Sequence, residues 1–190
     1  MNSRMISDEK QDEEARIVER AVEGSRQAFS LLFNQYYDSL NRYFFFRLGN
    51  QQEAEDLTGI IFLKAWQNLR RFNPSKGTFK AWLYRIAHNT LIDQYRKKRD
   101  EISLNEVQDF ILEETKPEEE IITKQKILQL KKALDHLDER SRSVIIYRFI
   151  AGLDHHETAQ MLGISDGNVR VIQLRALEKV KGFFAEDDDG

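Results

Sequence analysis

The sequence predicts an all-α protein of two small helical domains joined by a flexible acidic linker. Apolar residues recur with helical spacing, and no strand-like alternation of apolar and polar residues is sustained. Only two of the 190 residues are proline, Pro74 and Pro117, so long stretches can be helical without a break. This length allows one domain or two small ones.

Charge is arranged in blocks that divide the chain. The net charge is −2 in residues 1–20, +7 in 21–99, −7 in 100–124, +3 in 125–182 and −4 in 183–190. Basic blocks suit nucleic acid, and the acidic block between them suits a basic partner. Two solvated domains with an acidic tether would give the same pattern, so charge alone leaves both interpretations open.

The composition excludes several classes of protein. The chain has no cysteine, which rules out a disulfide framework and a cysteine-ligated zinc finger. Its polar, acidic start is unlike a secretory signal. No apolar run reaches the ~20 residues that cross a bilayer. We therefore expect a cytoplasmic protein with no membrane insertion.

Three helices are expected in the N-terminal half, at residues 26–48, 51–70 and 79–99. Gly49 ends the first helix, and Pro74 and Gly77 break the chain before the third. In the C-terminal half, proline followed by three acids is typical of a helix start. Four helices are expected there, at residues 117–137, 140–151, 154–162 and 166–183.

These elements give five segments. They are an acidic N-terminal extension (1–23), a first domain (24–100), an acidic linker (101–124), a second domain (125–183) and an acidic tail (184–190).

The helix at 51–70 carries apolar residues on two sides. One stripe should face the core and contains Ala54, Leu57, Thr58, Ile61, Ala65 and Leu69. A second row contains Asp56, Ile60, Leu63 and Gln67. Two bulky apolar groups in an otherwise polar row indicate a docking surface. The alternative is a helix that is buried on both sides within its own bundle.

The helix at 79–99 combines basic and aromatic side chains. One face carries Arg85, Asn89 and Arg96, and Trp82 flanks the apolar stripe. Such a surface suits single-stranded DNA, because phosphates meet cations and unstacked bases meet rings. The preceding loop contains Lys76 and could hold an extruded base. The basic run at 96–99 taken alone also fits a solvated helix end.

Residues 155–174 fill every position of a helix-turn-helix pattern. Ala159 is small where the two helices should touch, and Gly163 can adopt the positive φ of the turn. Val169 and Ile172 are placed to line the inner face of the second helix. An ordinary helical hairpin is the alternative.

In a helix-turn-helix, the second helix enters the major groove. Ser165 or Asp166 can cap this helix. The side chains placed to meet bases or phosphates are Arg170, Gln173, Leu174 and Arg175. Arginine suits guanine because its fork matches two acceptors on one base edge.

The sequence predicts neither an enzyme nor a cofactor site. His155, His156 and Glu157 are consecutive, so on a helix they point about 100° apart and do not converge on a metal ion. There is no phosphate-binding GxxxxGK[ST] motif, no pair of acids at a recognisable metal spacing and no nucleophile with a base.

Three segments resemble the sigma-70 family, and in particular its extracytoplasmic-function (group four) branch. They are AEDLTGIIFLKAW (54–66), RFNPSKGTFKAWLYRIAHNTLIDQYRKKR (71–99) and LDERSRSVIIYRFIAGLDHHETAQMLGISDGNVRVIQLRALEKV (137–180). The resemblance implies a sigma factor, a non-enzymatic subunit that directs bacterial RNA polymerase core to promoter DNA. The first domain would bind the clamp helices of the largest subunit and melt the minus-10 element. The second would bind the flap of the other large subunit and read the minus-35 element.

The resemblance also assigns roles by position. The polymerase-binding positions are Asp56, Leu57, Phe62 and Trp66, and the exposed row adds Ile60 and Leu63. The minus-10 positions are Lys76, Thr78, Trp82, Arg85, Asn89 and Arg96. The minus-35 positions are Arg148, Arg170, Val171, Leu174 and Arg175, and the helix pattern adds Gln173. An anti-sigma partner is implied as well.

Two features depart from the family pattern. Gly59 and Ile60 stand where a Gln-Glu pair is usual, so an apolar contact replaces a polar one on the docking row. The recognition helix VRVIQLRAL lacks the common serine-arginine pair, and we expect an unusual promoter preference. A stand-alone helix-turn-helix regulator would explain residues 125–183 equally well, but not the basic, aromatic helix at 79–99.

Overall fold

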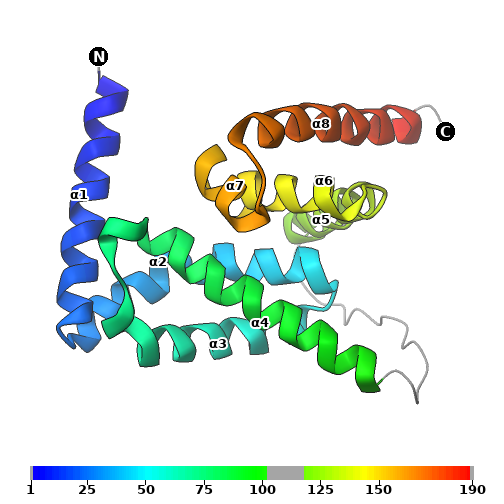
Figure 1. Cartoon of the computed structure of the whole chain (residues 1–190). Helices are drawn as coiled ribbons and strands as arrows, with labels where there is room; N and C mark the ends of the chain where they lie inside the picture. Colours follow the sequence, from blue (N-terminus) through cyan, green and yellow to red (C-terminus); the bar gives the residue numbers. More distant parts are fainter. Residues whose placement is uncertain (1, 102–117, 189–190) are drawn as a thin grey trace.

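The computed structural model describes residues 2–101 and 118–188, which form two helical bundles (Figure 1). The first bundle contains α1 (Asn2–Val22), α2 (Arg26–Leu48), α3 (Gln51–Asn68), the short helices η1 (Leu69–Arg71) and η2 (Pro74–Lys76), and α4 (Phe79–Glu101). The second contains α5 (Glu118–Asp135), α6 (Glu139–Ile145), η3 (Ile146–Ile150), α7 (His155–Leu162) and α8 (Asp166–Asp188). The described residues include no strand, and the all-α, two-bundle prediction is confirmed.

Local capping signals determine where α2 and α3 begin and end. The Ser25 side chain accepts a hydrogen bond from the Ala28 amide and begins α2. Gly49 ends that helix at a φ of 75°, a left-handed conformation that glycine adopts without steric cost. The Asn50 side chain then accepts from the Glu53 amide and begins α3. The predicted break at Gly49 is confirmed.

Helix α1 is an addition to the predicted elements, because the acidic N-terminal residues gave no helix in the sequence pattern. Its last turns bury Val18 and Ala21 against the first bundle. The amide of Gln35 in α2 also donates to the Glu14 carboxylate, with 2.7 Å between the two atoms. Only four apolar residues mark this stripe among many charges, so its periodicity was easily missed.

Other boundaries differ in detail from those predicted. The helix expected at 51–70 ends at Asn68, and the single turn η1 follows it. The expected loop before α4 contains the single turn η2, and the helix expected at 140–151 becomes α6 followed by the π-helical turn η3. Helix α8 continues to Asp188, five residues beyond its expected end. Most of the predicted linker, residues 102–117, lies outside the described residues.

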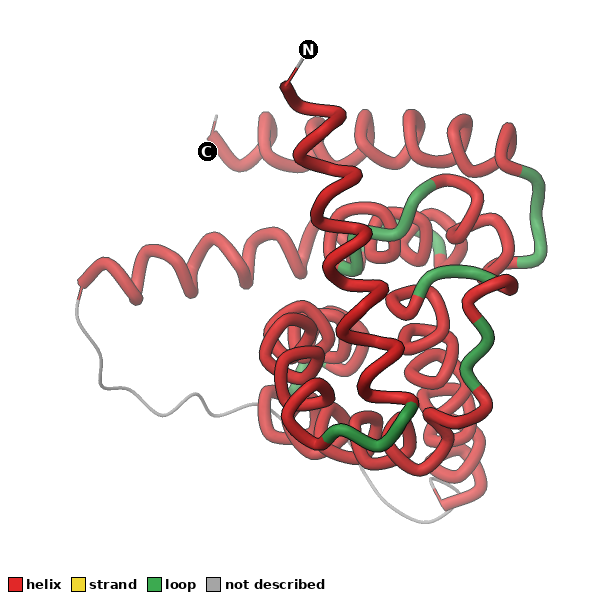
Figure 2. Tube along the Cα trace, turned by 90° about the vertical axis from the view of Figure 1, so that its left-hand side faces the viewer, coloured by secondary structure: helices red, strands yellow, loops and turns green. Residues whose placement is uncertain are grey.

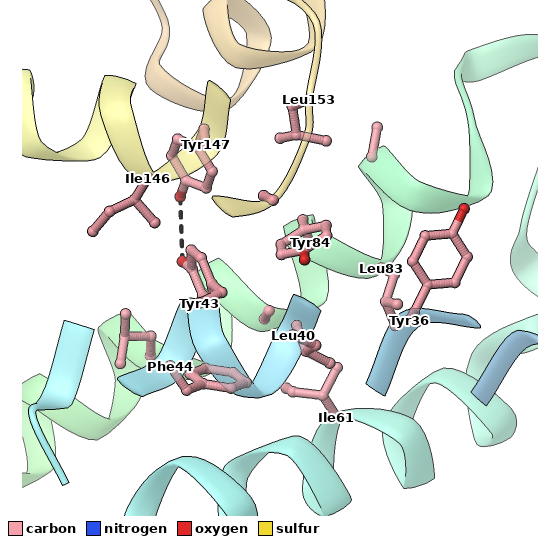
Figure 3. Close-up of a cluster of buried hydrophobic side chains, with 14 of the residues drawn as sticks. Tyr36, Leu40, Tyr43, Phe44, Ile61, Leu83, Tyr84, Ile146, Tyr147 and Leu153 are labelled. Atoms are coloured by element: carbon pink, nitrogen blue, oxygen red, sulfur yellow. Dashed lines mark hydrogen bonds between the residues drawn. The ribbon is translucent and has the colours of Figure 1, made fainter. Parts of the chain in front are cut away.

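The two bundles share a continuous apolar core. The α3 stripe predicted to face the core is buried throughout, at Ala54, Leu57, Thr58, Ile61, Ala65 and Leu69. Figure 3 shows Tyr43 of α2 and Tyr147 of η3 pointing toward each other across the boundary between the bundles. Their rings stack with centroids 5.8 Å apart, and their hydroxyl oxygens lie 3.4 Å apart. The tethered domains are therefore packed together in this structure.

Helix α8 lies on the side of the second bundle that faces away from the first, with α5–α7 between them (Figures 1 and 2). Its packing partners are α5, α6 and α7. Among the described residues, no helix combines the length and the apolar character needed to cross a membrane.

The two faces of α3 predict different effects on stability. Ile61→Ala removes a fully buried side chain and should lower the free energy of unfolding by about 2–5 kcal/mol. Ile60→Ala, one residue earlier on the exposed face, should cost less than about 1 kcal/mol. Urea unfolding followed by circular dichroism measures both changes, and equal losses would contradict the assignment of the two faces.

Candidate nucleic-acid interface

The loop before α4 is held by short-range hydrogen bonds. The Asn73 side chain accepts from the Ser75 amide at 2.9 Å and caps η2, which presents Lys76 to solvent. Gly77 has a φ of 138°, a region that favours glycine. The Thr78 hydroxyl oxygen then accepts from the Ala81 amide at 3.1 Å and caps α4. The loop therefore has a defined shape.

Three aromatic side chains in this loop and at the start of α4 pack together. The rings of Phe72, Phe79 and Trp82 contact one another with centroid distances of 5.5–5.9 Å. Phe79 is buried, whereas Trp82 is only half-buried. The predicted minus-10 residue Trp82 therefore belongs to a packed cluster and has part of its ring available at the surface.

Four of the predicted minus-10 residues form one exposed stripe along α4. Thr78, Arg85, Asn89 and Arg96 are all exposed and are separated by seven, four and seven residues. At 100° per residue these positions fall on one side of the helix, and at 1.5 Å per residue they extend over about 27 Å. Such a stripe matches the length of several nucleotides of an extended strand.

The outer face of α3 is apolar where solvent reaches it. Ile60 is 42% exposed and Leu63 is 58% exposed, and the exposed Asp56 lies beside them. Burial of α3 on both sides within its own bundle is therefore excluded. These three residues share one exposed face of α3, as the helical spacing predicted. Their role in docking stays a prediction.

The other three predicted polymerase-binding residues lie inside the bundle or at its edge. Leu57 and Phe62 are buried in the core. The Phe62 ring packs on Phe33 with centroids 4.5 Å apart, and the half-buried Trp66 packs on Phe29 at 4.9 Å. In the structure these three residues hold α3 against α2, so the exposed surface that is available to polymerase is smaller than predicted.

The second bundle contains the predicted helix-turn-helix, formed by α7 and α8. Gly163 ends α7 at a φ of 65°, and its amide donates to the Ala159 carbonyl. The Ser165 hydroxyl oxygen accepts from the Asn168 amide at 3.3 Å, which identifies Ser165 as the cap of α8. Ala159 and Val169 are buried together in a small apolar cluster. The helix-turn-helix predicted for residues 155–174 is therefore present in the structure.

The exposed face of α8 carries most of the predicted minus-35 residues. Arg170, Val171, Leu174 and Arg175 are all exposed, and Leu174 is 62% exposed. No other described helix contacts this face closely, since α8 packs on α5, α6 and α7 through its opposite side. Two arginines and two apolar side chains are thus available together on one surface.

Two of the predicted minus-35 residues pair with each other instead. The Arg148 guanidinium donates from Nε to Oε1 of Gln173 at 3.1 Å and also donates to the Leu153 carbonyl oxygen. Gln173 lies on the inner side of α8, four residues after the buried Val169 and three before the buried Ala176. The helical pattern contained this information, since these spacings indicate one face.

Sequence reasoning missed the contacts that join the two bundles. The Thr78 hydroxyl donates to the Glu157 carboxylate at 2.5 Å, and Nζ of Lys80 donates to the Gly152 carbonyl oxygen at 2.8 Å. No local signal could have identified these pairs, because their members are more than 70 residues apart in the chain.

Comparison with known proteins agrees with the two-part arrangement. Residues 32–101 match the family Sigma-70 region 2, and residues 133–182 match the family Sigma-70, region 4. The chain is 32% identical over 173 residues to the ECF RNA polymerase sigma factor BldN of Streptomyces coelicolor, covering 90% of this chain and 66% of BldN. It is 32% identical over 162 residues to the RNA polymerase sigma factor YlaC of Bacillus subtilis, covering 82% of this chain and 91% of YlaC.

Solved structures share the fold. The structure of CnrH in complex with the cytosolic domain of CnrY has a TM-score of 0.68 and 26% identity, and the match covers 90% of this chain and 96% of CnrH. The sigma factor RpoE of Bartonella quintana, solved in complex with the anti-sigma factor NepR, has a TM-score of 0.64 and 21% identity. That match covers 83% of this chain and 96% of the RpoE chain.

Two glycines near the interface predict opposite effects of the same substitution. An added Cβ meets no atom within 4 Å at Gly77 or at Gly59, so the backbone conformation alone determines the change in stability. Gly77→Ala should lower the free energy of unfolding by roughly 1–3 kcal/mol, because its φ of 138° strains alanine. Gly59→Ala, inside α3, should raise it by about 1 kcal/mol. Thermal unfolding measures both, and a change of the same sign in both variants would contradict this explanation.

Proposed function

Because this chain belongs to the sigma-70 family, in its extracytoplasmic-function branch, we propose that it initiates transcription through polymerase contacts in both domains and two DNA-binding faces. Members of this family are promoter-specific transcription initiation factors and not enzymes. A stand-alone regulator does not fit, because the region 2 match occupies the part of the chain where such a regulator would carry a sensing domain. The order of the two matches along one chain is the observation that carries the proposal.

We assign the first promoter task to the domain at residues 24–100. The stripe Thr78, Arg85, Asn89 and Arg96 would hold the phosphates of the opened minus-10 strand, with Lys76 at its end. The half-buried Trp82 would offer one ring surface to an unstacked base, a contact worth about 1–3 kcal/mol per base. The shaped loop before α4 supports this assignment, because a flipped base needs a pre-formed pocket edge.

We assign minus-35 reading to the domain at residues 125–183. The exposed face of α8 would enter the major groove, where Arg170 and Arg175 can meet guanine or phosphate and Val171 and Leu174 can meet thymine methyl groups. Arg148 and Gln173 would act from behind this face, because their mutual hydrogen bond fixes α8 on η3. This divides the predicted minus-35 set into a contacting group and a supporting pair.

Polymerase core would dock on the exposed row of α3, formed by Asp56, Ile60 and Leu63. The residues that hold this row in place are Leu57, Phe62 and Trp66. Clamp helices of the largest subunit and the flap of the other large subunit are the proposed contacts of the two domains. We also propose an anti-sigma partner, since the apolar pair on α3 needs a cover when polymerase is absent. The place of action is then the cytoplasm, where polymerase meets DNA.

In vitro transcription with purified core polymerase on a library of promoters tests the proposal. A defined start site that depends on added chain supports it, and the absence of any such start on every template would reject it.

Charge on the α3 row should weaken polymerase binding. Ile60→Asp combined with Leu63→Asp places two carboxylates where apolar contact is proposed, and we expect at least a tenfold weaker affinity for core, about 1.4 kcal/mol. Biolayer interferometry with immobilised core measures this. Ile60→Leu combined with Leu63→Met keeps the surface apolar and serves as the matched control. Unchanged binding by the aspartate pair would remove this row from the interface.

Substitutions on α8 should distinguish a residue that reads a base from a residue that holds the helix in place. Arg175→Ala should weaken binding of the holoenzyme to its minus-35 duplex by about 1–3 kcal/mol and relax the preference at one base pair, if the side chain reads that base. Gln173→Ala should weaken binding to all sequences alike, because it loosens the Arg148 support and leaves the exposed face unchanged. Competition binding with single-base variants of the duplex distinguishes the two, and identical base preferences in Arg175→Ala and the parent would exclude Arg175 as a reader.

A further inference from the structure

The outer face of α8 is apolar at its centre. Gly167, Val171 and Leu174 are four and three residues apart, so at 100° per residue they fall within about 60° of one another around the helix. Val171 is 49% exposed, and Leu174, at 62%, is more exposed than any other large apolar side chain that the structure describes. The buried residues Val169 and Ala176 mark the opposite side of the helix. Two aliphatic side chains therefore point away from the bundle into solvent.

Arginines flank this apolar centre on both sides. Arg170 and Arg175 are exposed, and the helical spacing places them about 70° to either side of it. A helix in the major groove turns its centre toward the base edges on the groove floor and its flanks toward the two phosphate backbones. An arginine on a flank can reach a phosphate or a base edge, whereas the shorter Val171 and Leu174 can meet only the groove floor.

The neighbouring residues on this face limit where the apolar contact can occur. Gly167 lies in the first turn of α8, and a Cβ added there would meet no atom within 4 Å, so the start of the helix can approach DNA closely. Glu178 lies on the same face one turn after Leu174, and its carboxylate repels phosphate. The rise from Val171 to Leu174 is about 4.5 Å, slightly more than the spacing of base pairs. The two side chains therefore meet adjacent base pairs.

The chemistry of the major groove determines what an aliphatic side chain can recognise there. The C5 methyl of thymine is its apolar group, and the other groups on the base edges are hydrogen-bond donors and acceptors. An aliphatic side chain over a polar edge removes water from that edge and offers no hydrogen bond in return. Contact with a methyl group avoids this cost and buries apolar area, which should raise the affinity about fourfold for each methyl group.

A second base carries the same apolar group. 5-Methylcytosine has a methyl group on C5, as thymine does, and the two bases differ at the neighbouring position, where thymine has an oxygen acceptor and cytosine an amino donor. An aliphatic side chain forms a hydrogen bond with neither of these groups. Contact with the methyl group alone therefore does not distinguish thymine from 5-methylcytosine.

We propose that Val171 and Leu174 recognise C5 methyl groups in the minus-35 element, and that they accept 5-methylcytosine in the same way as thymine. This inference rests on the proposed function, because it takes α8 as the helix that enters the groove. Its consequence is that methylation of a cytosine at a contacted position strengthens binding of the holoenzyme to that promoter.

Pairs of bases that differ only in the methyl group test the inference. In the minus-35 duplex found with the promoter library, each thymine is replaced in turn by uracil, which keeps the adenine partner. The same position is then made cytosine or 5-methylcytosine, both opposite guanine. Competition against the fluorescent parent duplex measures the affinity of the holoenzyme. At the contacted positions we expect the methyl group to raise the affinity about fourfold in both pairs.

Alanine variants identify the side chain that reads each methyl group. Leu174→Ala should abolish the methyl effect at one position, and Val171→Ala should abolish it at the adjacent one. Both side chains are about half exposed or more, so the variants should fold, which circular dichroism checks. Leu31→Ala is the matched control, because it truncates a leucine that is 47% exposed on α2. It should keep both methyl effects.

Equal affinity for thymine and uracil at every position would overturn the recognition of methyl groups. A methyl effect in the thymine pair without one in the cytosine pair would overturn the acceptance of 5-methylcytosine. Methyl effects that persist in both alanine variants would overturn the role of this pair of side chains. A holoenzyme that binds its own element no better than a scrambled duplex would reject the proposed function itself.

Discussion

The C-terminal part of helix α2, from Leu40 to Leu48, is apolar around most of its circumference, and this constraint organises the whole chain. An amphipathic helix needs one partner, whereas a helix that is apolar on all sides must be covered on all sides. Helix α2 buries Leu32, Tyr36, Leu40, Tyr43, Phe44 and Phe46, and it packs on α1, α3 and η3. The run from Tyr43 to Phe46 is too wide for the first bundle to cover alone. The second bundle completes the cover through Tyr147, which is why the two domains share a core.

The sequence predicted those features that a few neighbouring residues determine. The end of α2 at Gly49, the turn at Gly163 and the buried stripe of α3 each depend on one side chain or one helical period. The exposed pair Ile60 and Leu63 was also predictable, because it interrupts a polar row. Helix α1 was missed, since a stripe of four apolar residues is weak beside so many charges.

The contacts between the domains were beyond local reasoning for a different reason. Arg47 follows three phenylalanines, and nothing near it indicates an acidic partner 92 residues away. The position of Thr78 predicted a DNA contact, but the structure adds a capping bond to Ala81 and a bond to Glu157. The inward direction of Gln173 was available from helical spacing, yet its partner Arg148 was not, because that pairing depends on how η3 packs on α8.

The position of α1 separates the boundary of the family from the boundary of the folding unit. The region 2 match begins at residue 32, while Val18, Ala21 and Ala28 lie buried upstream of it. A fragment that begins at residue 32 would keep every residue proposed to contact DNA or polymerase and still uncover an apolar seam along α2. Exposed seams of this kind favour self-association. Fragments of this protein that are chosen by homology alone would therefore precipitate for a reason unrelated to their function.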